Sequence, residues 1–151
     1  MLATVFLLLS TVFQNTYNPD VADCRDIGFD APAGEVKGPC FWIGDGQKIY
    51  RVGHGVPSPR PKGSAVLYVD RKDIPDVKAR KPEALKVRID RAGNLQVLEI
   101  VRSISPSVDG IALREAPKWK FEPVVFNGNT VTVEFNVIVP IYFKNGKCYI
   151  C

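Results

Sequence analysis

The sequence predicts an α+β fold with two layers, in which an antiparallel three-stranded sheet carries one or two helices on one face. Three segments in the second half of the chain alternate apolar and polar residues, and a segment between them has helical spacing. The length of 151 residues, 46% of them hydrophobic, suits a single core. We therefore expect one domain over residues 64–151, preceded by a glycine- and proline-rich arm that contains a short hairpin.

The N-terminus carries an uncharged apolar run of 12 residues, Leu2–Phe13. At about 1.5 Å per helical residue it reaches roughly 18 Å, against about 30 Å of hydrocarbon, so it cannot cross a bilayer alone. Its length and position match the apolar region of a secretory signal peptide. We expect residues 1–17 to be a signal peptide, with a truncated membrane anchor or a core segment of the mature fold as alternatives.

Residues 18–63 form the arm, which holds eight of the twelve glycines and six of the twelve prolines. This composition opposes long helices and favours turns and short strands. Within the arm, Phe41–Ile43 and Gln47–Val52 flank Gly44-Asp45-Gly46, a pattern typical of a hairpin.

The first part of the domain is less regular. Residues 64–69 are expected to form a short strand, and residues 75–85 have modest helical character. The segment Arg60–Arg91 holds ten Lys and Arg against five Asp and Glu. Because acids interrupt the basic residues, the pattern favours a solvated linker and helix face, with contact to an anionic surface as the alternative.

A hairpin and a helix follow. Leu85–Asp90 alternates apolar and charged residues, Ala92-Gly93-Asn94 supplies a turn, and Leu95–Arg102 is the second strand. Residues 108–116 then place apolar side chains at helical spacing. Ser107 is the candidate N-cap of this helix, which Pro117 should end or kink.

The clearest pattern lies in residues 130–144, where every odd position from Val131 to Phe143 is apolar. This alternation predicts a long strand with one buried face. Pro140 cannot donate to a neighbouring strand, so one side of the strand should be unpaired or bulged there. The sequence therefore predicts an edge strand.

The four cysteines, an even number in an exported chain, are typical of disulfides. Cys148 and Cys151 are one close pair, whereas Cys24 and Cys40 are too far apart in sequence to complete a zinc site. A redox-active Cys-x-x-Cys would open a helix, for which the sequence has no residues after Cys151. Disulfides are the preferred interpretation, metal, redox or free-thiol roles are the alternatives, and three pairings remain open.

Catalytic motifs are not evident. The sole histidine, His54, is flanked by glycines, and the chain lacks nucleophile-elbow, zincin and phosphate-loop motifs. We expect no enzyme, no metal and no cofactor, and we interpret His54 as a loop residue with an unusual backbone conformation, with a ligand or a pH switch as the alternative. The formal charge of +4 is too small to indicate nucleic acid binding.

The order of hairpin, helix and strand, with Trp119-Lys120-Phe121-Glu122-Pro123 before the last strand, resembles the C-terminal domain of the TonB family of periplasmic energy-transducing proteins. The resemblance covers roughly residues 85–143, with residues 89–94 similar to the family's strand and turn and Asn127-Gly128 similar to its last turn. Independently of the family, Trp119 and Phe121 lie two apart in an extended segment, so both side chains can close the helix onto the sheet. With Pro123, which holds the chain extended, they form a structural core motif.

The resemblance implies a protein-binding module in the periplasm of a Gram-negative bacterium, which pairs by strand addition with an extended peptide of an outer-membrane receptor in energy-dependent uptake. We expect the binding edge to run from Thr132 to Tyr142 and to present its even positions, namely Thr132, Glu134, Asn136, Ile138 and Tyr142. An inner-membrane energising complex and, through the same edge, a second copy of the chain are further candidate partners. The chain shows no full membrane-spanning helix and no long proline-rich spacer, which favours a binding or adaptor role unless its start is misannotated, in which case it would be anchored in the inner membrane.

The alternative function is that of an envelope structural protein whose basic segment, Arg60–Arg91, contacts an anionic cell wall or membrane surface. Ionic strength separates the two functions, because salt screens surface charge and leaves main-chain pairing intact.

Overall fold

The computed structural model describes residues 39–74 and 81–151, which form an α+β fold made mostly of strands with one short helix. The predicted signal peptide and most of the predicted helical segment at 75–85 lie outside the described residues. The strands are β1 (Phe41–Gly44), β2 (Gln47–Arg51), β3 (Pro61–Lys62), β4 (Leu67–Val69), β5 (Ala84–Ile89), β6 (Leu95–Arg102), β7 (Lys120–Phe121), β8 (Val124–Phe126), β9 (Asn129–Ile138), β10 (Ile141–Phe143) and β11 (Cys148–Ile150). The helical elements are α1 (Pro106–Glu115) and the 3₁₀ turns η1 (Arg71–Asp73) and η2 (Ala116–Lys118).

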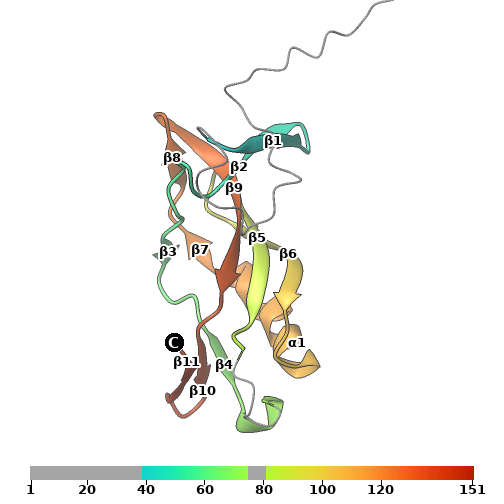
Figure 1. The fold of residues 1–151 in the computed structure, drawn as a ribbon. Helices are drawn as coiled ribbons and strands as arrows, with labels where there is room; N and C mark the ends of the chain where they lie inside the picture. The colour runs from blue at the N-terminus through green and yellow to red at the C-terminus, as the bar shows by residue number, and fades with distance from the viewer. Residues whose placement is uncertain (1–38, 75–80) are drawn as a thin grey trace, which may run out of the picture.

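The largest sheet has the strand order β1-β2-β9-β5-β6, and β8 also pairs with β9 (Figure 1). β5 is antiparallel to both β6 and β9, as expected for the predicted three-stranded sheet. β2, however, pairs with β9 in parallel and brings β1 with it, so the three strands are part of a larger, mixed sheet. The prediction of a purely antiparallel three-stranded sheet was therefore too simple. The hairpin predicted around Gly44-Asp45-Gly46 is present, but it belongs to this sheet.

Pro140 divides the long strand predicted over residues 130–144 into β9 and β10, which lie in different sheets. β10 joins the small sheet β11-β10-β4, at the opposite end of the fold from the β1–β2 hairpin (Figure 1). At the break, the Leu67 N–H donates to the Pro140 carbonyl at 3.0 Å. Proline has no N–H to continue the ladder, which explains why the strand changes partners at this position.

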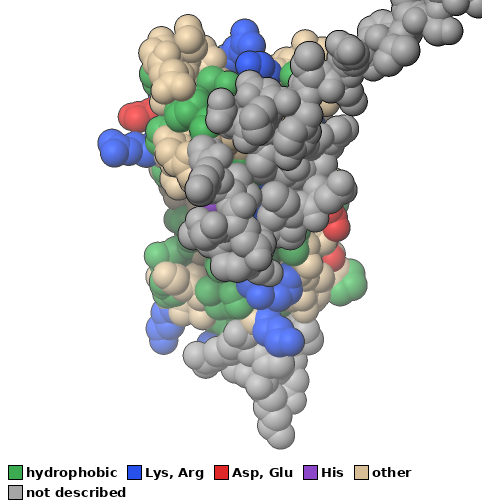
Figure 2. All heavy atoms as spheres, turned by 45° about the horizontal axis from the view of Figure 1, so that its top comes forward, with side chains coloured by type: hydrophobic (Ala, Val, Ile, Leu, Met, Phe, Trp, Pro, Cys, Tyr) green, Lys and Arg blue, Asp and Glu red, His purple; other side chains and the backbone are tan. Residues whose placement is uncertain are grey.

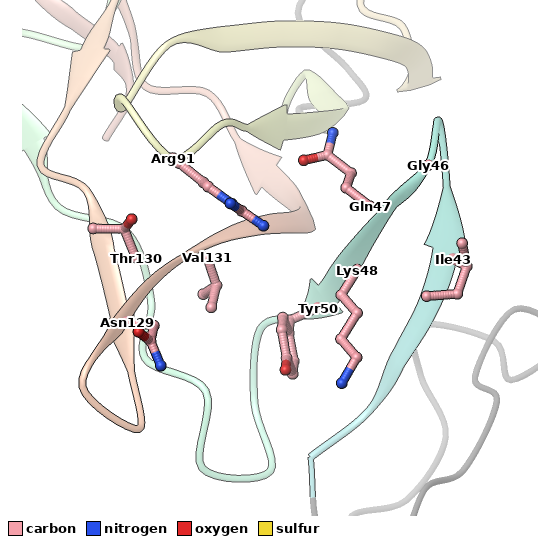
Figure 3. A pocket seen from close by; sticks show the side chains of 9 residues that line it. All are labelled: Ile43, Gly46, Gln47, Lys48, Tyr50, Arg91, Asn129, Thr130 and Val131. Atoms are coloured by element: carbon pink, nitrogen blue, oxygen red, sulfur yellow. The ribbon is translucent and has the colours of Figure 1, made fainter.

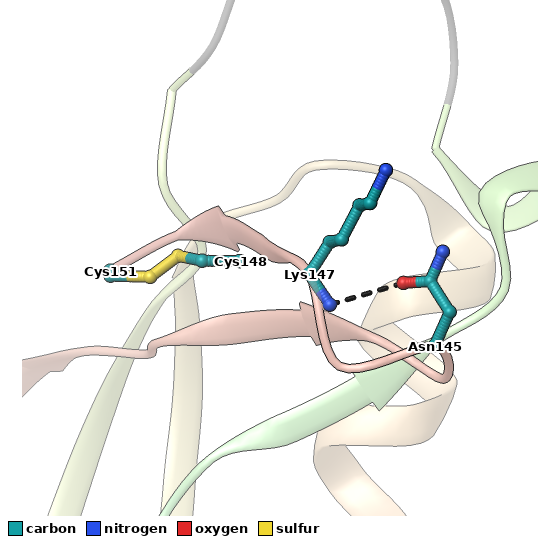
Figure 4. The surroundings of a disulfide bond; sticks show 4 residues. All are labelled: Asn145, Lys147, Cys148 and Cys151. Atoms are coloured by element: carbon teal, nitrogen blue, oxygen red, sulfur yellow. Dashed lines mark hydrogen bonds between the residues drawn. A yellow bond between two sulfur atoms is a disulfide. The ribbon is translucent and has the colours of Figure 1, made fainter.

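Disulfides are present at both ends of the described chain. Cys148 and Cys151 are bonded, with Cα atoms 6.0 Å apart, beside a turn in which the Lys147 N–H donates to Asn145 Oδ1 (Figure 4). Cys40 is disulfide-bonded and buried, whereas Cys24 lies outside the described residues. The described cysteines therefore serve as structural links.

Helix α1 begins two residues earlier than predicted. Ser105, and not Ser107, is its N-cap, because the Ser105 hydroxyl accepts the Val108 N–H at 3.1 Å and Pro106 occupies the first turn. The Ser107 hydroxyl instead donates to Asp73 Oδ1 at 2.6 Å. Pro117 lies in η2, which follows α1 directly, as a proline that ends a regular helix should.

The core fills the space between α1 with η2 and one face of the main sheet. Val108 and Ala112 of the helix are fully buried, and the same cluster contains Leu85, Val87, Ile89 and Val133 of β5 and β9. Each fully buried Leu, Ile or Val side chain contributes about 1.5–3 kcal/mol relative to exposure. Trp119 and Phe121 belong to this cluster, whereas Pro123 is exposed between β7 and β8, so its part in the motif is conformational and it packs into no core.

Candidate functional site

The strand predicted to offer the binding edge is an interior strand over much of its length. β9 lies between β2, which pairs with Thr132–Glu134, and β5, which pairs with Val133–Ile138. The prediction of an open edge is therefore wrong at Thr132 and Glu134, where the arm supplies a neighbouring strand. Alternation in a single strand reveals which face is buried, but it does not reveal which strand lies alongside.

The edge prediction is also wrong at Tyr142. This residue lies in β10, which has β4 on one side and β11 on the other. Its ring lies 6.2 Å from that of Tyr68 across the parallel β4–β10 pair. The five predicted edge residues are thus split between two sheets.

Asn136 and Ile138 remain open on one side. The Glu134 carbonyl accepts the Val52 N–H at 3.3 Å on the β2 side, whereas the Val139 N–H donates to Glu83 on the β5 side. Because successive residues of a strand direct their backbone groups to opposite sides, Asn136 and Ile138 present theirs on the β2 side, beyond the end of β2. No strand of the described residues pairs with them there. We call the outer side of β9 from Phe135 to Ile138 the open slot.

Two side chains at the open slot, Asn136 and Ile138, have little contact with the described residues. Ile138 is 58% exposed, the largest exposed fraction of any aliphatic side chain in the main sheet apart from Ile43. Asn136 Oδ1 is buried, and no donor from the described part of the chain reaches it. An exposed apolar group beside backbone groups that no described strand pairs with is suited to contact with another chain.

Next to the open slot, one arginine joins two strands and the turn of the β1–β2 hairpin. Arg88 of β5 donates from Nη2 to Glu134 of β9 at 2.9 Å and from Nη1 to Asp45, in the β1–β2 turn, at 2.7 Å. The Glu134 side chain is only 4% exposed, so this pair satisfies an otherwise buried charge. Burial opposes the charged form of Arg88, but the hydrogen bonds to Asp45 and Glu134 outweigh it and raise the pKa of the guanidinium.

Thr132 is tied to the hairpin as well. It is buried, and its hydroxyl lies 3.0 Å from Gln47 Oε1, to which it donates. These contacts of Arg88 and Thr132 with the hairpin could not be predicted from the sequence, because Asp45 and Gln47 lie far from their partners along the chain. The alternating charges of Leu85–Asp90 were the only available signal, since they placed Arg88 on a polar face.

The strand order of the main sheet ends at β1 on one side and at β6 on the other, and β6 is the longer of these two edge strands. Eight residues, Leu95–Arg102, form the last strand of the order, and Val101 is 47% exposed. β6 pairs with β5 through two register irregularities, at Ala84/Leu85 and Lys86/Val87. Irregularities of this kind twist an edge strand and discourage further pairing, so we consider β6 the weaker candidate.

His54 adopts the unusual backbone conformation that its glycine neighbours suggested. Its φ is 51°, between Gly53 at 106° and Gly55 at 95°, in a tight turn closed by hydrogen bonds between Gly53 and Val56. The turn leads the chain away from β9 after Val52. Among residues 39–74 and 81–151, no group of three or more His, Cys, Asp or Glu side chains has the arrangement of a metal site.

The basic segment Arg60–Arg91 does not form one continuous element. Its described residues divide among β3, β4, η1, β5 and the segments that connect them. On the face shown in Figure 2, the Lys and Arg side chains lie at separate positions. Arg88 is also engaged in the ion pairs described above. Binding of an anionic surface by this segment stays a prediction.

The second half of the chain matches a known family. Residues 84–145 match the family model described as Gram-negative bacterial TonB protein C-terminal. This range contains β5, β6, α1, β9 and β10, and it begins after the β1–β2 hairpin. Comparison with curated proteins and with solved structures gave no match. In the described part of the chain, no helix is long and apolar enough to cross a membrane.

Proposed function

Because residues 84–145 are a TonB C-terminal domain, of a family that is periplasmic in Gram-negative bacteria, non-enzymatic and engaged with outer-membrane receptors, we propose that this chain binds an extended receptor peptide by strand addition. We propose the open slot, Phe135–Ile138, as the place where the peptide pairs. The observation that supports it is that β2 pairs with β9 only from Thr132 to Glu134, so no strand of the described residues pairs with Asn136 and Ile138 on that side.

Main-chain pairing at this place fits the physical chemistry of the slot. Each backbone hydrogen bond contributes about 0.5–1.5 kcal/mol net, so specificity must come from side chains. The exposed Ile138 offers apolar area. We therefore propose that the partner segment carries an apolar side chain that reaches Ile138.

The first prediction concerns backbone amide hydrogen exchange, followed by NMR. In the free protein, the Asn136 and Ile138 amides should exchange rapidly, because no described group accepts them. Adding a synthetic peptide from the periplasmic plug of an outer-membrane receptor of the same genome should slow their exchange. The Val137 amide is the internal control, since it faces β5 and is protected with or without peptide.

Two outcomes would contradict the proposal. Slower exchange along β6 with none at Asn136 or Ile138 would move the site to the other edge of the sheet. Binding that disappears between low and physiological ionic strength would indicate surface charge and favour the anionic-surface function.

A further inference from the structure

We infer that the β1–β2 hairpin is an exchangeable occupant of β9, and that the receptor segment replaces β2 and pairs with β9 from Thr132 to Ile138. The inference rests on the proposed function, because it concerns the same side of the same strand. In the open slot two residues present backbone groups to the receptor segment. After replacement of β2 there are four, namely Thr132, Glu134, Asn136 and Ile138.

The first argument is that β2 is held much less extensively than β5. β2 pairs with β9 through three residues, Ile49–Arg51, whereas β5 pairs through six, Ala84–Ile89. The β2 pairing is also parallel, which is slightly less stable per residue than antiparallel pairing. The hairpin is therefore the weaker neighbour of β9.

The second argument is a cavity of about 550 Å³ between the hairpin and the first residues of β9 (Figure 3). Its walls include Gln47 and Lys48 of β2 and Asn129–Val131 of β9. The backbone of the first half of β2 therefore stands apart from β9, with the Gln47 side chain bridging to Thr132, and only the second half of β2 is in register with β9. Among the described residues, its charged lining residues are Lys48 and Arg91 and no carboxylate lines it, so no described acid pairs with either cation within the cavity.

The third argument is electrostatic. The hairpin contributes Asp45 to the Arg88 cluster, and the Asp45 side chain is 77% exposed. Glu134, the buried acid, keeps Arg88 as its partner when the hairpin leaves, because Arg88 belongs to β5 and donates to it from both Nε and Nη2. Glu134 therefore keeps its counter-charge when the hairpin leaves. Breaking a buried ion pair is costly mainly when one charge is left buried without a partner, and that does not happen here.

The fourth argument is direction. β2 ends where the turn through Gly53 and His54 leads away from β9, directly before the open slot. A partner strand that runs parallel to β9, as β2 does, can continue past Glu134 without that turn. β2 also indicates the side chains that fit: Ile49 is fully buried, and the Tyr50 ring lies 5.4 Å from that of Phe126. The structure therefore favours a partner with an aliphatic residue followed by an aromatic one.

Hydrogen exchange of the unmodified protein tests the replacement directly. The Val52 amide donates to Glu134 and reports contact between β2 and β9. When the plug peptide binds, the Val52 amide should lose protection while Asn136 and Ile138 gain it. If those two gain protection and Val52 keeps its own, the peptide binds beside β2 and the replacement is wrong, although the proposed function stands. If neither Asn136 nor Ile138 changes, the proposed function fails and the inference fails with it.

A pair of glycine variants provides the matched comparison. Gly46, in the hairpin turn, has φ 72°, and Gly146, in the β10–β11 turn, has φ 83°; a Cβ at either would meet no atom within 4 Å. Valine strains both turns similarly, but only Gly46→Val loosens the strand that covers β9. We expect Gly46→Val to tighten peptide binding about fivefold and Gly146→Val to leave it unchanged. Equal affinities for the two variants would overturn the replacement.

Discussion

Glu83 combines complete burial with an ionisable side chain, just before β5. Its Oε2 accepts the Ile104 N–H at 2.8 Å, whereas no donor in the described residues reaches Oε1. The carboxyl group of Asp109 lies beside it, and Asp109 Oδ1 also lacks a donor. Burial, together with the neighbouring Asp109, raises the pKa of Glu83 to about 7 from an ordinary value of 4.5. A proton on Glu83 would give the two carboxyls the hydrogen bond that they lack.

This raised pKa predicts a specific dependence of stability on pH. The folded state binds the Glu83 proton more tightly than the unfolded state does, so the stabilisation is complete below about 4.5 and is lost as pH rises through about 7. Glu83→Gln should therefore be more stable than the natural chain at pH 8, by on the order of 1–3 kcal/mol, and the difference should shrink towards pH 5. Urea unfolding at several pH values measures it.

The control for that experiment is Glu99→Gln, which removes one negative charge from an exposed position on β6. If the two variants differ from the natural chain by the same amount at every pH, the burial of Glu83 does not govern the effect.

Gly93 shows how one backbone position fixes the β5–β6 turn. Its φ is 86°, and a Cβ here would overlap the carbonyl of Phe121. The Asp90 carboxylate organises the same turn: burial acts against its charge, but hydrogen bonds from Asn94 and Ala92 prevail and lower its pKa. Gly93 also accepts the Phe121 N–H, which links the turn to β7.

Substitution of Gly93 should therefore cost more than conformational strain alone. We expect Gly93→Ala to lower the free energy of unfolding by about 3 kcal/mol or more, because strain and backbone overlap add. Gly128→Ala is the comparison, since Gly128 has φ 79° with open space around it, and it should cost about 1 kcal/mol. Thermal or chemical unfolding of both variants measures the two losses of stability. Equal losses would show that the close approach of Gly93 to the Phe121 carbonyl does not add to the cost.

Among the elements, helix α1 depends on its N-cap, Ser105, both for its first turn and for its contact with η1. The Ser105 hydroxyl accepts the Val108 N–H and donates to the Asp73 carbonyl at 2.6 Å, so it joins the helix to η1. Both groups lose their partner if the hydroxyl is removed, at a buried position.

Ser105→Ala should accordingly reduce the free energy of unfolding by about 1–2 kcal/mol. Ser107→Ala is the matched control, because it lies two residues away, is exposed and bonds only to the Asp73 side chain. If Ser107→Ala lowered the free energy of unfolding as much as Ser105→Ala, the assignment of Ser105 as the N-cap would be wrong.

Elements defined by neighbouring residues could be predicted from the sequence. The β5–β6 strands, the helix and the burial of Val131 and Val133 in β9 follow from periods of two or 3.6 residues. The predicted helix start is two residues late, because Ser105 and Ser107 both suit a cap and only the fold around Asp73 distinguishes them. The end of β9 was signalled by Pro140, although its consequence was a change of sheet and not an exposed edge.

The arrangement of the complete sheet could not be predicted in the same way. Thr132 and Gln47 are 85 residues apart, and Arg88 and Asp45 are 43 apart, so no local period records that they meet. The resemblance and the family match cover the second half of the chain and say nothing of the hairpin that covers β9. The open slot could therefore be defined only from the position of β2. The sequence alone does not distinguish Asn136 and Ile138, which lie beyond the end of β2, from the other predicted edge residues.

The parallel alignment of β2 with β9 has a mechanical consequence. Strands that lie side by side share a load along their axis, because every hydrogen bond between them must fail together. A load on the tip of the hairpin at Asp45 and Gly46 instead opens those bonds one after another. A receptor segment paired along β9 would therefore resist a pulling force large enough to peel the hairpin away. The same side of β9 could then release the hairpin easily and hold the receptor segment under tension.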